Sequence, residues 1–133
     1  MSPEERTARS AYRLTHAERM LDDAKAAFHA GRYASSINRS YYAAFHGMNT
    51  LLALDGMILK RHSGVISEFR RRYIGTGIIS ANISIIIGEL FTHRNNCDYR
   101  DFYTPTHEEA AEMLQGAETV VESVKTYLQS WNL

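Results

Sequence analysis

Apolar side chains recur at intervals of three and four residues along most of this chain, and that spacing constrains the fold more than any other feature. Near the N-terminus the repeating positions are Ala11, Leu14, Ala17, Leu21, Ala24 and Phe28. Near the C-terminus they are Ala110, Met113, Ala117, Val120, Val124 and Leu128. This spacing is that of one face of an α-helix. No segment alternates like a β-strand over more than a few residues, so the sequence predicts an all-α fold.

Glycines and prolines divide the chain into helical segments. Pro3 and Pro105 stand where helices are expected to begin, and no proline between them interrupts a helix. We expect helices up to Gly31, over 33–54, from Ser63 to just before Gly75, over about 82–95, and from Thr106 onward. Thr106 and Glu109 have the spacing of a capping box. These segments predict a single domain over residues 1–133, a bundle of four or five helices.

The segment 33–54 contains almost no charge. Its only Lys, Arg, Asp or Glu is Arg39. Because a helix without charged side chains has little surface suited to water, we expect most of its circumference to be covered. Either the other helices or a second subunit would provide that cover.

Composition narrows the class of protein. Fifteen basic and fifteen acidic residues give a formal net charge of zero, whereas a protein that holds nucleic acid by bulk electrostatics is usually basic. The single cysteine, Cys97, excludes an internal disulfide and is typical of a reducing compartment. The first ten residues are charged, and no apolar run is long enough to cross a bilayer. We therefore expect a cytoplasmic protein without a secretory signal or a membrane partner.

Charge is distributed unevenly along the chain. Between Gly56 and Gly75 there are five cations, Lys60, Arg61, Arg70, Arg71 and Arg72, against one anion, Glu68. From Asp101 to Glu122 there are six anions and no Lys or Arg. One interpretation is a basic patch in which Lys60, Arg61, Arg70 and Arg71 guide a nucleic-acid backbone. The alternatives are two solvated helix faces, or pairing between opposite faces of two molecules.

The stretch ELFTHRNNCDYRDFYTP, residues 89–105, places an arginine at the end of an apolar stripe. Arg94 follows Ile83, Ile87 and Leu90 by eleven, seven and four residues, so the four side chains share one helix face. A guanidinium in that position needs a partner, because an unpaired buried charge is costly. The carboxylate of Asp98 or Asp101 could supply one.

A phosphate-binding cleft is the other interpretation of the same stretch. In that case Arg94 faces a phosphate, Asp98 orients the guanidinium, and Tyr99 or Tyr103 lines the cleft. A salt-bridged helix end and a phosphate site use the same arginine, so the spacing alone leaves both open.

The other polar positions form no established site motif. Asn38 and Tyr42 lie one turn apart and could present polar groups to the same cleft or form a buried hydrogen-bonded pair. The run Gly75-Thr76-Gly77 lacks the lysine and spacing of a phosphate-binding loop. The six histidines have no metal-ligand spacing. We expect neither a metal nor a cofactor.

Three ordered segments resemble the HEPN domain family. They are GRYASSINRSYYAAFHGMNTLLALDG (31–56), KRHSGVISEFRRRYIGTG (60–77) and RNNCDYRDFY (94–103). The chain is most similar to the small stand-alone HEPN proteins. The resemblance implies an antiparallel helical bundle that forms a homodimer through its central helices. It also implies a metal-independent endoribonuclease, the toxin encoded beside a small nucleotidyltransferase antitoxin.

The resemblance also implies site residues. The family's site arginine corresponds to Arg94, and its polar residue on the second helix to Asn38. In the family, four to six residues separate the arginine from the histidine, and at those positions this chain has Tyr99, Arg100 and Asp101. His93 precedes Arg94, and its side chain would point roughly 100° away on a helix.

Without that histidine, Asp98 would have to act as the base in RNA cleavage and Tyr99 as the acid. The catalytic candidates are therefore Arg94, Asp98, Tyr99 and Asn38. Two alternatives remain open. One is a non-catalytic module that binds a nucleotide or a nucleotidyltransferase partner, with the acidic last helix as a docking face. The other is a structural dimer in which Arg94 and Asp98 only cap a helix.

Overall fold

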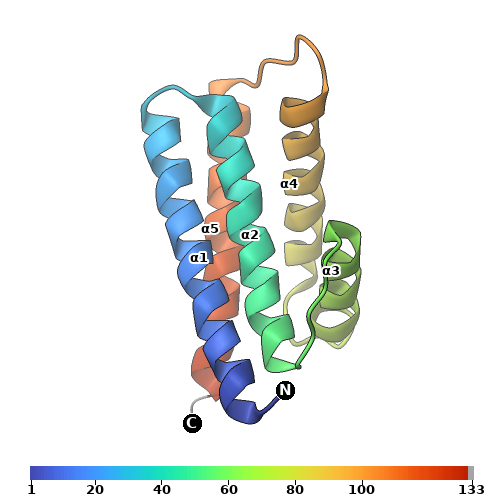
Figure 1. The fold of residues 1–133 in the computed structure, drawn as a ribbon. Helices are drawn as coiled ribbons and strands as arrows, with labels where there is room; N and C mark the ends of the chain where they lie inside the picture. The colour runs from blue at the N-terminus through green and yellow to red at the C-terminus, as the bar shows by residue number, and fades with distance from the viewer. Residues whose placement is uncertain (132–133) are drawn as a thin grey trace.

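The computed structural model describes residues 1–131 and contains five α-helices, with no β-strand in that range. The helices are α1 (Pro3–His29), α2 (Tyr33–Leu54), α3 (His62–Phe69), α4 (Ala81–Tyr99) and α5 (His107–Trp131). One turn of π-helix, η1 (Arg70–Ile74), continues α3. The helices α1, α2, α4 and α5 stand side by side and alternate in direction, with the short α3 beside the lower part of α4 (Figure 1). The all-α bundle predicted from the sequence is confirmed.

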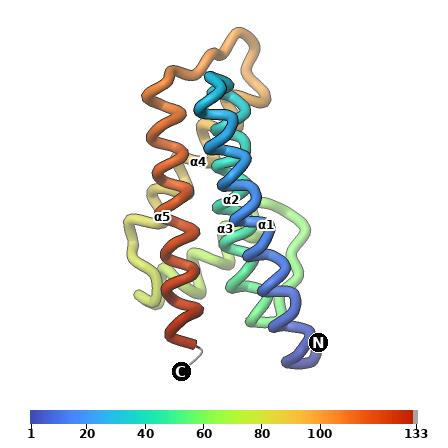
Figure 2. The backbone as a smooth tube through the Cα atoms, turned by 90° about the vertical axis from the view of Figure 1, so that its left-hand side faces the viewer, coloured from blue at the N-terminus to red at the C-terminus, as the bar shows by residue number. Residues whose placement is uncertain are grey.

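Helix α2 lies at the centre of the bundle. It has α1 on one side and α4 on the other, with α5 behind it (Figures 1 and 2). Most of its residues are buried, and Tyr41, Met48, Leu51 and Leu52 have no exposed surface. The helices of the same chain therefore provide the cover that the uncharged sequence of α2 requires. This feature does not by itself require a second subunit, and the homodimer remains a prediction.

Local sequence signals account for several helix ends. The backbone N–H of Glu109 donates to Thr106 Oγ1 at 3.0 Å, and the N–H of Thr106 donates to Glu109 Oε1 at 3.1 Å, as expected for the capping box. After α1 and α2 the backbone enters the left-handed region at Gly31 (φ 76°) and Gly56 (φ 77°), where a residue without Cβ is favoured.

Two local features differ from the sequence-based expectations. Helix α4 continues to Tyr99 rather than ending near Asn95, because nothing in the intervening residues breaks a helix. In α1, Ala11 is exposed and its neighbour Ser10 is buried instead. The hydroxyl of Ser10 donates to the carbonyl of Thr50 on α2 at 2.8 Å, so a small polar residue fits there better than the apolar spacing suggested.

Within residues 1–131, no helix combines the length and the apolar character needed to cross a membrane. Over the same range, no three metal-binding side chains gather closely enough to hold an ion.

Candidate functional site

Arg94 extends from the inward face of α4, one turn beyond the buried Leu90. Its side chain is only 11% exposed. Nη2 donates to the hydroxyl of Tyr42 on α2 at 2.9 Å, and Nη1 donates to Asn95 Oδ1 at 3.2 Å. Nε lies 2.9 Å from Asp98 Oδ2, in an ion pair whose N–H is not aligned for a hydrogen bond. The guanidinium is therefore held in one place from both helices.

Three tyrosine rings surround this guanidinium. Its Cζ atom lies 5.3 Å from the ring centres of both Tyr41 and Tyr42, and 5.4 Å from that of Tyr99. At these distances a cation is attracted to the ring faces. Tyr41 is fully buried, and its burial raises the pKa of the phenol to about 12, whereas Tyr99 is 71% exposed. Arg94 thus lies at a boundary between the core and a surface that a ligand can reach.

Asn38 joins the same cluster from α2. Its Nδ2 donates to Asp98 Oδ2 at 3.0 Å, so this carboxylate oxygen contacts both Asn38 and Arg94. A shallow pocket of about 210 Å³ opens beside the contact and is lined by Ala34, Ser35, Asn38, Arg39 and Asp98. The structure therefore brings together all four residues that the sequence singled out as catalytic candidates: Arg94, Asp98, Tyr99 and Asn38.

The position of Asp98 within α4 is informative. It lies in the last turn, where unpaired carbonyl groups create the negative end of the helix. A carboxylate at that end is disfavoured by the helix dipole. Its place is therefore explained by its contacts with Arg94 and Asn38, and not by helix capping. Asp101, the other carboxylate considered, is exposed.

His93 and Tyr103 belong to a different contact, between α4 and α5. The Nδ1 of His93 donates to the carbonyl of Glu89 at 2.9 Å, and Nε2 lies 3.7 Å from Glu109 Oε2. The hydroxyl of Tyr103 donates to the same Glu109 oxygen at 2.7 Å, and this bond, more than burial, raises the pKa of Tyr103 to about 12. His93 therefore points toward α5. Its direction away from Arg94 is the one expected from its position on the helix.

Cys97 has no reactive character. Its burial, together with the nearby carboxylates of Asp98 and Glu109, raises the pKa of the thiol to about 11. An uncharged thiol is a weak nucleophile, so the surroundings of Cys97 do not favour a nucleophilic role.

His62, at the start of α3, is the residue that the sequence analysis missed. Its Nδ1 lies 2.8 Å from the hydroxyl of Tyr41, and its ring lies edge-on to that of Tyr42, with ring centres 5.7 Å apart. Burial lowers the pKa of His62, and the charge of Arg94 lowers it further. No spacing rule connects His62 with Arg94, because the two residues come from different helices 32 positions apart.

The predicted basic patch is not uniform. Lys60, Arg61 and Arg71 are exposed, although Arg71 also forms an ion pair of 2.8 Å with Glu68. Arg70 is partly buried, and its Nη2 donates to the carbonyl of Ser84 on α4 at 3.0 Å. Contact with an RNA backbone remains a prediction for these residues, and Arg70 is the least accessible of the four.

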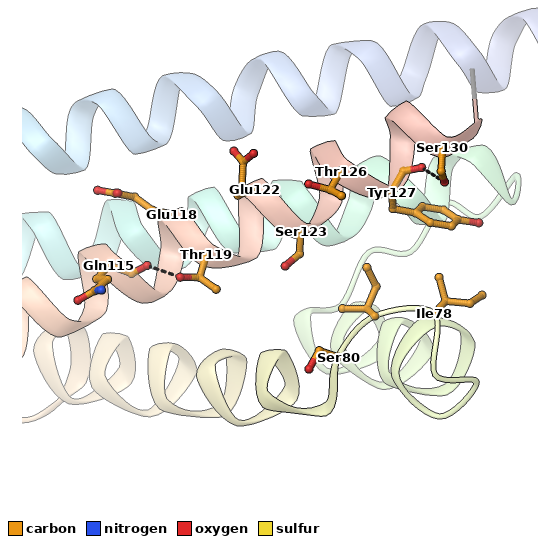
Figure 3. A pocket seen from close by; sticks show the side chains of 11 residues that line it. Ile78, Ser80, Gln115, Glu118, Thr119, Glu122, Ser123, Thr126, Tyr127 and Ser130 are labelled. Carbon is orange, nitrogen blue, oxygen red and sulfur yellow. Dashed lines mark hydrogen bonds between the residues drawn. The ribbon is translucent and has the colours of Figure 1, made fainter. Parts of the chain in front are cut away.

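A larger groove lies away from Arg94, between α5 and the segment that precedes α4 (Figure 3). Its volume is about 760 Å³. On the α5 side it is lined by hydroxyl groups and by Glu118 and Glu122, whereas Ile78, Ile79 and Ser80 line the opposite side. The groove contains no cation among its lining residues, so it suits a basic or hydrogen-bonding surface more than a phosphate.

Known proteins resemble this chain over most of its length. A family model for the HEPN domain matches residues 10–127. A "UPF0332 protein" of Thermotoga maritima is 29% identical over 118 residues, which cover 89% of each chain. "Putative toxin MJ0605" of Methanocaldococcus jannaschii is 34% identical over 116 residues, 85% of this chain and 84% of that one. "Putative toxin MJ0142" of the same organism is 27% identical over 120 residues, 90% and 82% of the two chains.

Proposed function

The chain belongs to the HEPN domain family, and on that premise we propose that it is the toxin of a HEPN/nucleotidyltransferase pair, acting as a metal-independent endoribonuclease. The two relatives named as toxins support a toxin-like role. The proposed antitoxin is a small nucleotidyltransferase, and the proposed substrate is RNA.

The placement of Arg94 is the observation that carries this proposal. A guanidinium held by the Tyr42 hydroxyl, the Asp98 carboxylate and three aromatic rings has little freedom left to lose when a phosphate binds. Preorganised cations of this kind stabilise the charge that develops on a phosphate in the transition state. Asp98 is itself held by Asn38, so the carboxylate that pairs with Arg94 is also fixed from α2.

The chemistry needs no metal. A base removes the proton of a 2′-hydroxyl, and the 2′-oxygen forms a bond to phosphorus. The bond between phosphorus and the 5′-oxygen then breaks, and the leaving oxygen takes a proton. The products are a 2′,3′-cyclic phosphate and a 5′-hydroxyl end. Arg94 binds the non-bridging oxygens, whose negative charge grows along this path.

A homodimer would place two such sites in one assembly. Each chain supplies one Arg94, and Lys60 and Arg61 are exposed and available to the RNA backbone. A short single-stranded substrate needs few phosphate contacts, so the net charge of zero is compatible with RNA binding.

The test is cleavage of total RNA in EDTA by purified wild type, Arg94→Ala, Arg94→Lys and Arg100→Ala. We expect wild type to cleave and Arg94→Ala to lose about 10²–10³-fold in rate, because the transition-state charge is left unbound. Arg94→Lys should recover only part of the rate, because an ammonium cannot reproduce the planar guanidinium contacts. The products should carry 2′,3′-cyclic phosphate ends.

Arg100→Ala is the matched control. Arg100 caps α4, and its guanidinium lies 5.7 Å from the ring of Tyr103, outside the Arg94 cluster. Its removal should leave the rate unchanged. Circular dichroism would confirm that each variant is folded. A wild-type rate retained in folded Arg94→Ala would contradict the mechanism.

A second candidate function is favoured by the acidic groove on α5. A non-catalytic HEPN module would bind a nucleotidyltransferase there, since Glu118 and Glu122 would attract a basic surface of the partner. In that case wild type leaves RNA intact and co-purifies with the nucleotidyltransferase encoded beside it. Cleavage by wild type in EDTA would decide for the first function.

A further inference from the structure

We propose that His62 is the general base of the Arg94 site, taking the 2′-hydroxyl proton of an RNA whose phosphate Arg94 holds. The proposal rests on the ribonuclease function above and deepens it, because it names a proton-transferring group that the residues following Arg94 do not contain.

Tyr42 brings the two side chains to one place. Nη2 of Arg94 donates to the Tyr42 hydroxyl, and the guanidinium carbon lies 5.3 Å from the centre of the Tyr42 ring. The imidazole of His62 meets the same ring edge-on, with 5.7 Å between the ring centres and 89° between the planes. His62 also stacks on Phe45 at 4.4 Å, which fixes the plane of the imidazole. Side chains of α2 therefore hold both the guanidinium of Arg94 and the imidazole of His62 in place.

The hydrogen-bond partner of His62 allows the imidazole to change its charge. Nδ1 lies 2.8 Å from the hydroxyl of Tyr41, and a hydroxyl can either donate or accept a hydrogen bond. The contact can therefore persist in both neutral tautomers and in the imidazolium. Within residues 1–131, no group forms a hydrogen bond with Nε2 of His62, and the side chain is partly exposed. Nε2 is thus the atom available to a substrate.

The surrounding charges favour a neutral ring before RNA binds. Tyr41 and Tyr42 from α2 pack against His62, and Arg94 from α4 is close enough for its charge to act on the imidazole. Burial lowers the pKa of His62, and Arg94 lowers it further, so the ring is unprotonated at neutral pH, as a general base requires. A phosphate bound to Arg94 compensates its charge and makes proton uptake by His62 easier.

The proton balance of the step is simple. Nε2 of His62 takes the proton of the 2′-hydroxyl while the bond between the 2′-oxygen and phosphorus forms. The bond between phosphorus and the 5′-oxygen breaks, and the 5′-oxygen takes a proton from water. The imidazolium then loses its proton to solvent, and the neutral ring is restored. No oxidant, reductant or metal enters the step.

The other groups near Arg94 are less suited to this task. Asp98 Oδ2 already contacts Arg94 and Asn38. His93 is tied through Nδ1 to the carbonyl of Glu89, and its ring faces α5. The phenol of Tyr41 is buried, with its pKa raised to about 12. His62 is therefore the side chain in this cluster that combines an imidazole, the usual general base of proteins, with a ring nitrogen that has no hydrogen-bond partner within residues 1–131.

The proposal is tested by initial rates of cleavage of a single-stranded RNA in EDTA from pH 5 to pH 9. The enzymes are wild type, His62→Gln, His62→Phe and His93→Gln. Gln keeps a polar partner for Tyr41, and Phe keeps the stacking on Phe45. We expect both His62 variants to lose at least about 100-fold in rate. As the pH falls, His62 takes up a proton and the wild-type rate should decrease. Both His62 variants should lack this decrease.

Two further measurements separate catalysis from structure. The affinity for a 2′-O-methyl RNA of the same sequence, which cannot be cleaved, should change by less than about 3-fold in the His62 variants, since Arg94 still binds the phosphate. Arg94→Ala should weaken that affinity. His93→Gln should retain the wild-type rate and pH profile, because His93 faces α5.

The outcomes are distinct. Suppose that wild type cleaves RNA and that either folded His62 variant cleaves it at the same rate and with the same pH profile. This result overturns the role of His62 and leaves the ribonuclease function standing. If wild type itself leaves RNA intact, the ribonuclease function fails, and the role of His62 falls with it. The proposal is supported if both His62 variants cleave more slowly, lack the decrease in rate at low pH, and keep the wild-type affinity for the 2′-O-methyl RNA.

Discussion

Two arginine–histidine clusters lie on opposite sides of α2. Arg94 and His62 meet around Tyr42, between α2, α3 and α4. Arg13 and His46 meet between α1 and α2, where Nη1 of Arg13 donates to Nδ1 of His46 at 3.2 Å. Arg94 has the carboxylate of Asp98 beside it, whereas no acid within residues 1–131 forms an ion pair with Arg13.

The difference between the clusters lies in what each histidine contacts through Nδ1. A guanidinium only donates, so the contact with Arg13 requires an unprotonated Nδ1 in His46. Burial, the charge of Arg13 and the neighbouring His16 together lower the pKa of His46 to about 4. His62 contacts a hydroxyl, which accepts as well as donates. One histidine is thus held neutral as part of the α1–α2 packing, and the other is free to exchange a proton.

Replacement of Asp98 by Asn should reduce the difference between the two clusters the most. The change keeps the shape of the side chain but removes the counter-ion of Arg94, making that cluster more like the one at Arg13. We expect RNA cleavage to fall about 10–100-fold, since charge-assisted contacts with Arg are lost. Initial rates in EDTA measure this.

Asp101→Asn is the control for that change. Asp101 is exposed and lies past the end of α4, so its replacement should leave the rate at the wild-type value. Equal losses in both variants would mean that overall charge, and not the ion pair with Arg94, decides the rate.

Replacement of His46 by Gln should have a smaller effect, on acid stability. The pKa of His46 is about 4 in the folded protein and near 6.5 in the unfolded chain. The stability that neutral His46 gives the folded protein is therefore fully present above pH 6.5 and is lost as the pH falls toward 4. His46→Gln should therefore lose less stability than wild type as the pH falls from 6.5 toward 4. Since the ring is partly exposed, we expect about 1 kcal/mol, or roughly 3–6 °C in Tm.

Thermal unfolding between pH 4 and pH 8 checks this expectation. His29→Gln, at the exposed end of α1, is the matched control and should retain the wild-type slope. A pH dependence of Tm in His46→Gln identical to that of wild type would show that His46 is not the group held neutral.

Removal of the Arg13 guanidinium should have the smallest effect. Arg13→Ala takes away the second of the causes that lower the pKa of His46 but leaves burial, the largest one. The pKa of His46 should therefore rise only part of the way toward its ordinary value, as measured by NMR titration of its ring protons. RNA cleavage should stay unchanged, because this cluster lies across α2 from Arg94. An unchanged pKa would mean that burial and His16 hold His46 neutral without Arg13, whereas a return to 6.5 would give Arg13 the whole effect.

Much of the fold follows from local sequence patterns. The interval of three to four residues in α1 and α5, the capping pair Thr106–Glu109 and the left-handed Gly31 and Gly56 each act over one or two turns of chain. Such signals can be read without knowing what lies opposite. The burial of Ser10 instead of Ala11 could not be read in this way, because it depends on a carbonyl of α2.

The candidate site divides along the same line. Arg94 and Asp98 are four residues apart, so the sequence offered Asp98 as one of two possible partners of Arg94, beside Asp101. The continuation of α4 to Tyr99 places Asp98 one turn from Arg94 on the same helix, and the ion pair forms there. Contacts across helices were open possibilities in the sequence. The hydrogen bonds from Asn38 to Asp98 and from Arg94 to Tyr42 depend on the position of α2 relative to α4. The sequence also left undecided whether α2 is covered by other helices of this chain or by a second subunit. The structure shows that helices of this chain cover it.

The sequence by itself determined the helical bundle, its family resemblance and the place of Arg94 on the apolar face of its helix, because those features are set by patterns within a few turns. Only the tertiary structure decided that His62 lies beside Tyr42 and that His93 faces α5. The direction of a side chain within its own helix is a local property. Which side chain of another helix meets it depends on how the whole bundle packs, and no interval along the chain encodes that meeting.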